Sequence, residues 1–164
     1  MNIILRYLEI SDLDNLLKIE NDERYWHLAG TQIPFTKEEL SNYIENAHAV
    51  ITEINQLRFV IDVDNQFAGL IDLYEYDSIQ KSAGVGIILF DEFQKKGIAQ
   101  ASLNLLIDYC KEELNVIELF ARIENDNLKS IILFEKCGFK EIKHLPNYLI
   151  KNGERADCKE YILK

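Results

Sequence analysis

Hydrophobic residues recur along this chain with the two spacings that distinguish strands from helices. Alternating or continuous apolar runs predict strands, and apolar residues three or four positions apart predict helices. We expect strands at residues 3–8, 57–63, 66–74, 83–90, 116–123, 140–150 and 156–163. We expect helices at residues 11–20, 36–47, 97–113 and 127–137, with a loop that contains several aromatic residues over 21–35. The order β-α-α-β-β-β-α-β-α-β-β indicates an α/β chain with a mixed sheet.

Polar residues and glycines mark the ends of these elements. Ser11 is the expected N-cap of the first helix, and Thr36-Lys37-Glu38-Glu39 is a capping-box pattern that opens the second. Asp64-Asn65 and Asn152-Gly153 predict tight hairpin turns, and Gly138 is the expected C-cap of the last helix. The strand 83–90 is nearly all apolar, so we expect it to be buried on both faces.

Size and composition favour one domain over residues 1–164. The chain has 164 residues, of which 48% are apolar, and it contains no internal repeat or linker. Its start lacks the pattern of a secretory signal, and no apolar run approaches the ~20 residues of a membrane-spanning helix. The three cysteines (Cys110, Cys137 and Cys158) are odd in number and scattered. They predict free thiols in a reducing cytoplasm, without a disulfide framework or a zinc site.

The net charge of −10 narrows the choice of partners. Such a surface repels phosphate backbones and attracts cationic small molecules or basic peptides, so we expect no nucleic-acid partner. Solubility alone is the more common reason for such a charge, so the charge only helps to choose between partners that other features indicate.

The segment 94–99, Gln-Lys-Lys-Gly-Ile-Ala, carries the first candidate chemistry because it lies between an apolar strand and a long helix. A helix N-terminus presents backbone N–H groups and the positive end of the helix dipole, which suits a pyrophosphate. Gly97 allows close approach to the backbone, Ala99 keeps the first turn open, and Lys95 and Lys96 add positive charge. An exposed turn with two solvated lysines would show the same residues.

A second segment, residues 127–139, completes a recognisable pair. Together the two segments resemble the GNAT superfamily of acetyl-CoA-dependent N-acetyltransferases. The family loop Q/R-x-x-G-x-G/A is matched by Gln94, Gly97 and Ala99. The family pattern N-x-x-A/S-x-x-L/F-Y-x-x-x-G-F is matched by Asn127, Ser130, Gly138 and Phe139. The opening and closing segments are most similar to those of the spermidine/spermine and ribosomal-protein N-terminal acetyltransferases, and residues 69–75 resemble the corresponding segment of the polyamine enzymes.

This resemblance implies the GNAT acyl-CoA N-acyltransferase fold, a mixed, mostly antiparallel sheet flanked by helices. Strands 83–90 and 116–123 would splay apart, and acetyl-CoA would enter the gap as co-substrate. The backbone of 87–89 would pair with the pantetheine arm, the amides of 95–99 would hold the pyrophosphate, and Asn127 would bond the arm. The residues expected at the cofactor are Ile87, Ile88, Leu89, Gln94, Lys95, Lys96, Gly97, Ile98, Ala99, Asn127, Ser130 and Phe134. No metal is implied.

The chain departs from the family at two positions that handle protons. Phe134 stands where many members have a tyrosine general acid, and Gly84 stands where many, including the polyamine enzymes, have a glutamate. A thiolate with a thiol pKa of about 8.5 leaves tolerably unprotonated, and losing one such group typically costs about 10²–10⁴-fold in rate. We therefore expect a working but slower enzyme.

The acceptor amine makes the need for a base quantitative. An alkyl amine of pKa about 10.4 is neutral roughly once in 2,500 molecules at pH 7, a deficit of about 4.6 kcal/mol, against about 1 kcal/mol for a peptide α-amine. Asp72 and Glu75, near the end of the strand before the cofactor strand, are the expected catalytic carboxylates, with Tyr148 as a third candidate. Solvated strand-end carboxylates would show the same pattern.

Several other aromatic residues and histidines are weaker site candidates. Tyr25, Trp26 and Phe35 would either line the acceptor site or pack the loop that carries them. His27, His48 and His144 lack metal-ligand spacing, and we interpret each as an ordinary surface or loop histidine.

The expected function is acetyl transfer from acetyl-CoA to a primary amine by direct attack in a ternary complex. A polyamine or similar small cation is the first acceptor hypothesis, and the N-terminal amine of a protein is the second. A non-catalytic acyl-CoA sensor is a hypothesis of a different class. No membrane partner is expected, and relatives suggest a homo-oligomer.

Overall fold

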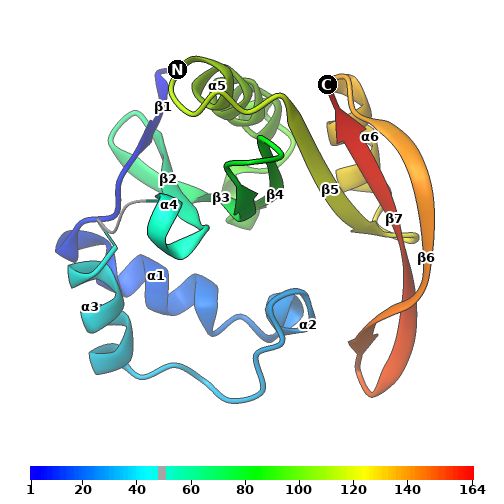
Figure 1. Cartoon of the computed structure of the whole chain (residues 1–164). Coiled ribbons are helices and arrows are strands. Elements are labelled where there is room, and N and C mark those ends of the chain that lie inside the picture. Colours follow the sequence, from blue (N-terminus) through cyan, green and yellow to red (C-terminus); the bar gives the residue numbers. More distant parts are fainter. Residues whose placement is uncertain (48–50) are drawn as a thin grey trace.

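The computed structural model describes residues 1–47 and 51–164. Within them, one seven-stranded sheet has the order β1-β2-β3-β4-β5-β7-β6 (Figure 1). The strands are β1 Ile3–Arg6, β2 Leu57–Val63, β3 Gln66–Asp77, β4 Ser82–Leu89, β5 Glu118–Glu124, β6 Lys140–Lys151 and β7 Glu154–Leu163. Neighbours pair antiparallel except β4 and β5, which are parallel, so the expected mixed and mostly antiparallel sheet is confirmed.

Helices cover both faces of this sheet (Figure 1). The α-helices are α1 Leu13–Glu20, α2 Trp26–Ala29, α3 Lys37–Glu45, α4 Ile51–Ile54, α5 Ile98–Glu112 and α6 Leu128–Lys136. Short 3₁₀ helices are η1 Ile10–Asp12, η2 Glu23–Tyr25 and η3 Asp91–Phe93. Helices α5 and α6 pack on one face, and α1 and α3 pack on the other.

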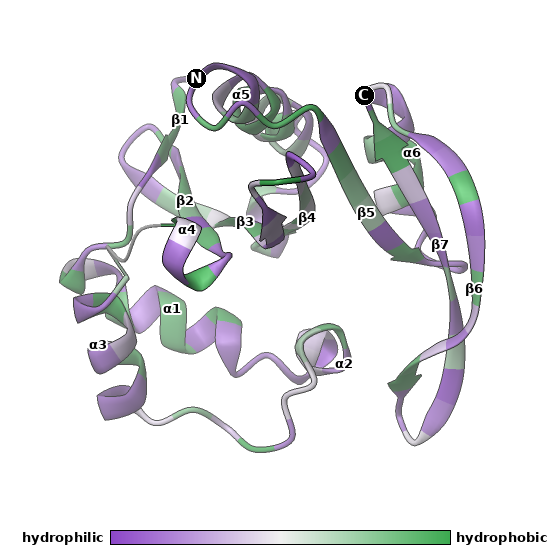
Figure 2. Cartoon of the chain, viewed as in Figure 1, coloured by the Kyte–Doolittle hydropathy of each residue, from purple (hydrophilic) through white to green (hydrophobic). Residues whose placement is uncertain are grey.

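Two apolar clusters hold these layers together. The larger cluster lies between the sheet and α5, with Ile61, Ile71 and Leu106 among its buried members. The smaller cluster joins Leu16 of α1 to Leu70 of β3 on the opposite face. Figure 2 shows hydrophobic and hydrophilic residues interleaved along α1, α3 and α5, as expected for helices with one buried face.

Both hairpin turns that the sequence predicts are confirmed. Asp64 and Asn65 have φ of 51° and 66°, and Asn152 and Gly153 have φ of 52° and 79°. Positive φ at both central residues matches the right-handed twist of the flanking strands. The Thr36 capping box is also confirmed, since its hydroxyl accepts from the amide of Glu39 and its own amide donates to the Glu39 carboxylate.

Three expectations about local structure were wrong. Ser11 lies inside η1, and Asp12 is the N-cap of α1, because Arg6 binds the Asp12 carboxylate at 2.8 and 2.9 Å and holds it there. Gly138 lies one residue beyond the C-cap of α6, which is Cys137. The segment 21–35 contains η2 and α2 rather than loop alone, because the Trp26 indole N–H donates to the Glu20 carbonyl and folds the chain back on α1.

The sheet opens between β4 and β5. Their pairing ends at Gly84–Phe120, although β4 continues to Leu89 and β5 continues to Glu124. Strands β5, β7 and β6 therefore diverge from the rest of the sheet (Figure 1). We call this opening the split. It corrects the expected burial of the whole strand 83–90, because residues 86–88 have no β5 neighbour and are only half-buried.

Candidate active site

Two glycines leave open space near the split, one on β4 and one just before α5. A Cβ added to Gly86 or Gly97 would meet no atom within 4 Å. Gly97 precedes α5 with a φ of 77°, and the amide of Ala101 is bonded to the Gly97 carbonyl. The preceding amides of the first turn therefore have no acceptor within the helix, so they can bind a phosphate group.

The rest of the 94–99 segment supports this loop. The Gln94 side chain donates to the carbonyl of Leu89 at 3.2 Å and to the carboxylate of Asp91 at 3.1 Å, which fixes the loop against the end of β4. Lys95 and Lys96 are exposed, whereas Ile98 is buried in the core. Ile98 can thus offer a ligand its backbone amide but not its side chain.

The predicted residues of α6 have unequal access to a ligand. Asn127 is the N-cap of the helix, and its side chain accepts from the amide of Ser130 at 3.3 Å. Ser130 is half-buried. Phe134 is only 3% exposed and packs edge-on against Phe139, so its ring belongs to the core in this structure.

Asp72 lies on the sheet face covered by α1 and α3, opposite α5. Both of its carboxylate oxygens accept from Arg58 of β2, at 2.7 and 2.8 Å. Arg58 also donates to Glu20 at the end of α1. A half-buried arginine therefore occupies both oxygens of Asp72, which leaves Asp72 poorly placed to accept a proton from a substrate.

Glu75 reaches across the split. One of its carboxylate oxygens accepts from Arg122 of β5 at 2.6 Å, and the carboxylate is 57% exposed. Its φ of 49° and the register shift after Tyr74 mark a β-bulge. Bulges redirect side chains near functional sites, and this one turns Glu75 toward β5.

Arg122 is the centre of the cluster around Glu75. It also binds Glu160 of β7 at 3.0 Å, and its guanidinium lies 4.6 Å from the ring centroid of Phe120. Tyr148 of β6 is 5.7 Å from the same guanidinium. The cluster thus links β3 to β5, β6 and β7 across the split, where backbone pairing is missing.

Tyr74 was not singled out from the sequence. Its ring covers Gly84, because a Cβ at residue 84 would lie 2.4 Å from Cε2 of Tyr74 and 2.8 Å from Cε2 of Phe120. Burial raises the pKa of the Tyr74 hydroxyl to about 12. The sequence holds one clue to this contact, a large residue at 74 and a glycine at 84. The clue can be recognised only once the β3–β4 register shows that these two residues are paired.

His27 also differs from the expectation. Its side chain is 12% exposed and pairs with Glu124 of β5, which in turn accepts from Lys151 of β6 at 3.0 Å. These two bonds lower the pKa of Glu124, although its burial acts in the opposite direction. His27 therefore attaches α2 to the far side of the split instead of lying free on the surface. His48 lies outside the described residues.

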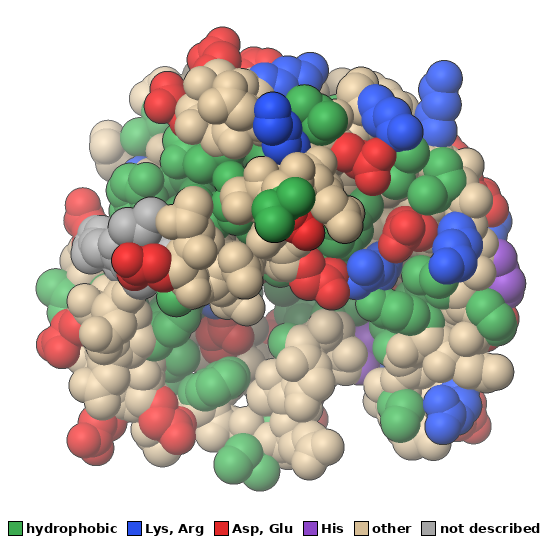
Figure 3. Space-filling model, viewed as in Figure 1, with side chains coloured by type: hydrophobic (Ala, Val, Ile, Leu, Met, Phe, Trp, Pro, Cys, Tyr) green, Lys and Arg blue, Asp and Glu red, His purple; other side chains and the backbone are tan. Residues whose placement is uncertain are grey.

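The aromatic residues of this region have contacts within the segment 21–35. The ring of Tyr25 lies 5.3 Å from the Arg24 guanidinium, and Asn21 closes the following loop by bonding the backbone of Phe35. Figure 3 shows this side of the molecule hollowed in its middle, with acidic side chains at the rim.

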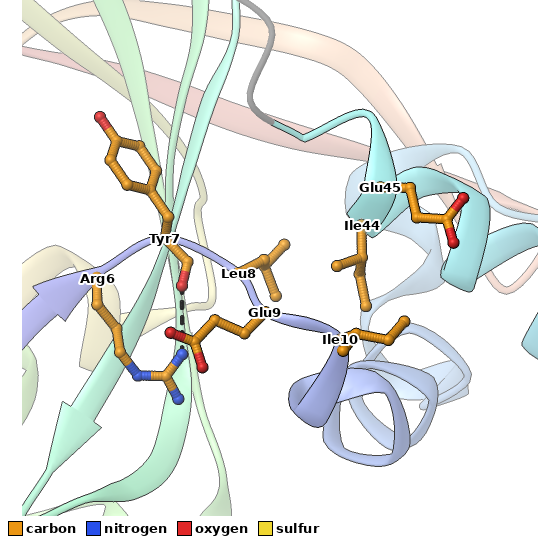
Figure 4. Close-up of a pocket in the computed structure, with 7 residues that line it drawn as sticks. All are labelled: Arg6, Tyr7, Leu8, Glu9, Ile10, Ile44 and Glu45. Atoms are coloured by element: carbon orange, nitrogen blue, oxygen red, sulfur yellow. Dashed lines mark hydrogen bonds between the residues drawn. The ribbon is translucent and has the colours of Figure 1, made fainter.

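A separate hollow of about 730 Å³ lies near the N-terminus. It is lined by Arg6, Tyr7, Leu8, Glu9, Ile10, Ile44 and Glu45 (Figure 4). No residue predicted to bind acetyl-CoA or the acceptor lines it. Among the described residues, no helix is long and apolar enough to cross a membrane, and all three cysteines are free thiols.

A sheet that splits between two parallel strands, with a glycine-led helix N-terminus beyond the first of them, is the architecture of a CoA-dependent acyltransferase. The acetyltransferase (GNAT) domain model matches residues 2–140. The chain therefore belongs to the GNAT acetyltransferases, enzymes that use acetyl-CoA.

Relatives agree with this assignment. A spermidine N(1)-acetyltransferase of Vibrio cholerae is 32% identical over 99% of this chain and 93% of its own length. A structure of spermidine N-acetyltransferase from that organism with CoA and spermine has a TM-score of 0.87 and 29% identity, over 98% of this chain and 94% of that one. A Bacillus subtilis protein named for ribosomal N-acetyltransferase activity, YdaF, is 28% identical over 99% of this chain and 91% of its own.

Proposed function

We propose that this enzyme transfers the acetyl group of acetyl-CoA to a primary amine of a polyamine or similar small cation, by direct attack in a ternary complex. One observation carries the proposal: Glu75 is held by a β-bulge at the split, with one carboxylate oxygen bonded to Arg122 and the side chain still exposed. The relatives that act on spermidine support the acceptor class.

In this proposal one group of residues binds acetyl-CoA, and Glu75 accepts a proton from the acceptor amine. The amides of residues 95–99 hold the pyrophosphate, and the backbone of 87–89, which has no β5 neighbour, pairs with the pantetheine arm. Gln94 fixes the loop, and Asn127 and Ser130 approach the arm from the N-terminal end of α6. When bound, acetyl-CoA supplies an activated thioester, and Glu75 takes the first proton from the protonated amine.

Charge neutralisation favours a second acceptor. Asp72 and Glu20 share Arg58, Glu75 and Glu160 share Arg122, and Glu124 is paired with Lys151 and His27. A site whose carboxylates already have cationic partners also suits the single charge of a protein N-terminus. Membership of an enzyme family favours both acceptors over a non-catalytic acyl-CoA sensor.

The Glu75→Gln variant tests the assignment of the base. We expect kcat/KM for spermidine to fall about 10²-fold at pH 7 and to recover in part at pH 9, because solvent then supplies more neutral amine. Asp72→Asn is the matched control, with a smaller loss because both Asp72 oxygens are bound by Arg58. The double variant should match Glu75→Gln. If Glu75→Gln acetylates spermidine as fast as the parent at pH 7, Glu75 is not the base.

We also propose that the chain forms a homo-oligomer. Strand β6 is an edge of the sheet, and it exposes Ile142, Tyr148 and Ile150. An edge strand with exposed apolar side chains invites contact with a second chain. Light scattering of the purified protein measures the assembly, and a monomer at micromolar concentration would contradict the proposal.

A further inference from the structure

The aromatic pair at the inner end of the split differs from the carboxylate clusters around it. Tyr74 pairs with Gly84 in the β3–β4 register, and Gly84 pairs with Phe120 in the last step of the β4–β5 ladder. The rings of Tyr74 and Phe120 meet edge to face, with centroids 5.8 Å apart. Tyr74 therefore covers the point at which β4 and β5 begin to separate.

This point is where a group that enters the split along β4 must stop. The open side of the split starts at the 94–99 loop, and its walls are the unpaired parts of β4 and β5. Beyond Gly84 the strands are hydrogen-bonded and admit nothing between them. A ligand whose pyrophosphate lies at the loop thus presents its distal, reactive end near the Tyr74 phenol.

The surroundings of Tyr74 keep its hydroxyl protonated. The ionisable groups whose charges affect the pKa of this hydroxyl are Arg122, Glu75 and Tyr148. The hydroxyl also lies within hydrogen-bonding reach of the Arg122 backbone. Burial dominates and raises the pKa of Tyr74 to about 12, so the phenol is neutral at pH 7. A neutral hydroxyl can donate one hydrogen bond and accept another at the same time.

We propose, on the basis of the acetyl transfer proposed above, that Tyr74 is a catalytic residue whose hydroxyl passes a proton from the attacking amine to the departing sulfur. As the nitrogen bonds to the thioester carbon and the carbon–sulfur bond breaks, the Tyr74 hydroxyl gives its proton to the sulfur. Its oxygen accepts one proton from the nitrogen in the same step. The amine becomes an amide, the sulfur becomes a thiol, and Tyr74 returns to its starting state.

This role is distinct from that of Glu75. A protonated primary amine loses two protons on the way to an amide. Glu75 takes the proton that must leave before attack, and Tyr74 takes the proton that leaves during attack. Many family members have a glutamate and a tyrosine where this chain has Gly84 and Phe134, which cannot donate or accept a proton. Proton transfer through Tyr74 would replace the function of those two missing side chains.

The Tyr74→Phe variant isolates the hydroxyl, because the ring still fills the space over Gly84. We expect kcat to fall about 10²-fold or more, with the KM for acetyl-CoA unchanged. Tyr76→Phe is the matched control, since Tyr76 lies on the same strand and packs against the core under α5. Tyr76→Phe should keep the parent kcat, and both variants should unfold at the parent temperature.

A binding measurement tests the contact without turnover. A phenol that donates to the sulfur favours the thiolate of CoA, so the bound thiol has a pKa below its free value of about 8.5. The affinity of the parent for CoA should therefore rise between pH 7 and pH 9. The affinity of Tyr74→Phe, and that of the parent for desulfo-CoA, should show no such rise.

The outcomes separate this inference from the proposed function. If the parent acetylates amines and Tyr74→Phe does so equally fast, the role of Tyr74 is wrong and the proposed function stands. If the parent acetylates no amine, the proposed function fails. The pH dependence of CoA binding then decides alone whether Tyr74 contacts the sulfur, and equal curves for CoA and desulfo-CoA would overturn that contact.

Discussion

Gly97 and Gly153 occupy nearly the same backbone conformation in different places. Their φ values are 77° and 79°, and a Cβ at either would meet no atom within 4 Å. Replacing each by glutamate therefore imposes the same strain and charge, once at the start of α5 and once in the β6–β7 turn. Only the first change places a carboxylate where we expect the pyrophosphate.

We expect Gly97→Glu to weaken CoA binding by about thirtyfold or more, equivalent to about 2 kcal/mol, as measured by calorimetry. Gly153→Glu should bind CoA as the parent does. Equal affinities for all three proteins would remove the 94–99 loop from the binding site.

Gly84 and Gly86 form a second matched pair, two residues apart on β4. A methyl group at 84 would press against Tyr74 and Phe120, whereas one at 86 would meet open space. Overpacking of this kind costs typically 1–3 kcal/mol. Gly84→Ala should therefore unfold at a lower denaturant concentration than the parent, while Gly86→Ala should not. If the denaturant midpoint of Gly84→Ala equals that of the parent, the rings of Tyr74 and Phe120 can move aside without cost.

Among the elements, α2 depends on a charge cluster for its attachment to β5 and β6. The pKa of Glu124 is lowered in the folded protein by His27 and Lys151. A carboxyl group whose folded pKa lies below its unfolded value stabilises the fold above the unfolded pKa and loses that effect as the pH falls through the folded pKa.

Glu124→Gln should therefore reduce the free energy of unfolding at pH 7 by about 1 kcal/mol, because it replaces the charge-assisted bonds of the buried Glu124 carboxylate to His27 and Lys151 with weaker neutral ones. The difference between variant and parent should shrink as the pH drops below about 4. Thermal unfolding across this range is the measurement. A difference that stays constant with pH would mean that the Glu124 charge does not hold α2.

The pattern of hydrophobic and polar residues was sufficient to predict those elements that depend only on residues close in sequence. Periodicity and turn residues located the strands, the long helix α5 and both hairpins, because each depends on neighbours along the chain. The charge clusters could not be predicted in this way. Arg122 meets Glu75, and His27 meets Glu124, only because the register and the split bring distant segments together.

The same limit applies to the candidate site. The Gln94–Ala99 loop was predictable because a helix start and its glycine lie in one short segment. The commitment of Asp72 to Arg58, the burial of Phe134 and the position of Tyr74 over Gly84 all require side-chain contacts across strands. The sequence therefore predicted the 94–99 loop and the start of α5 better than it predicted the surroundings of the side chains that we propose for proton transfer.

At the scale of the whole molecule, the net charge of −10 and the split sheet act together. The field of an acidic protein raises the local concentration of a cationic acceptor at long range. Arg58, Arg122 and Lys151 neutralise part of the acidic charge by pairing with carboxylates, so in the proposed reaction the final approach of the acceptor depends on shape and on Glu75. A polyamine benefits more from the long-range field than a singly charged amine does.

The rate of free CoA release from acetyl-CoA, measured with a panel of amines, tests the central claim most directly. The panel contains spermidine, a simple alkyl monoamine and a peptide with a free N-terminus, and Gly97→Glu serves as the control with weakened CoA binding. We predict that the parent releases CoA with the highest kcat/KM for spermidine, and that raised salt reduces this advantage by screening. CoA release that no amine accelerates above the rate with water alone would contradict acetyl transfer to an amine by this chain.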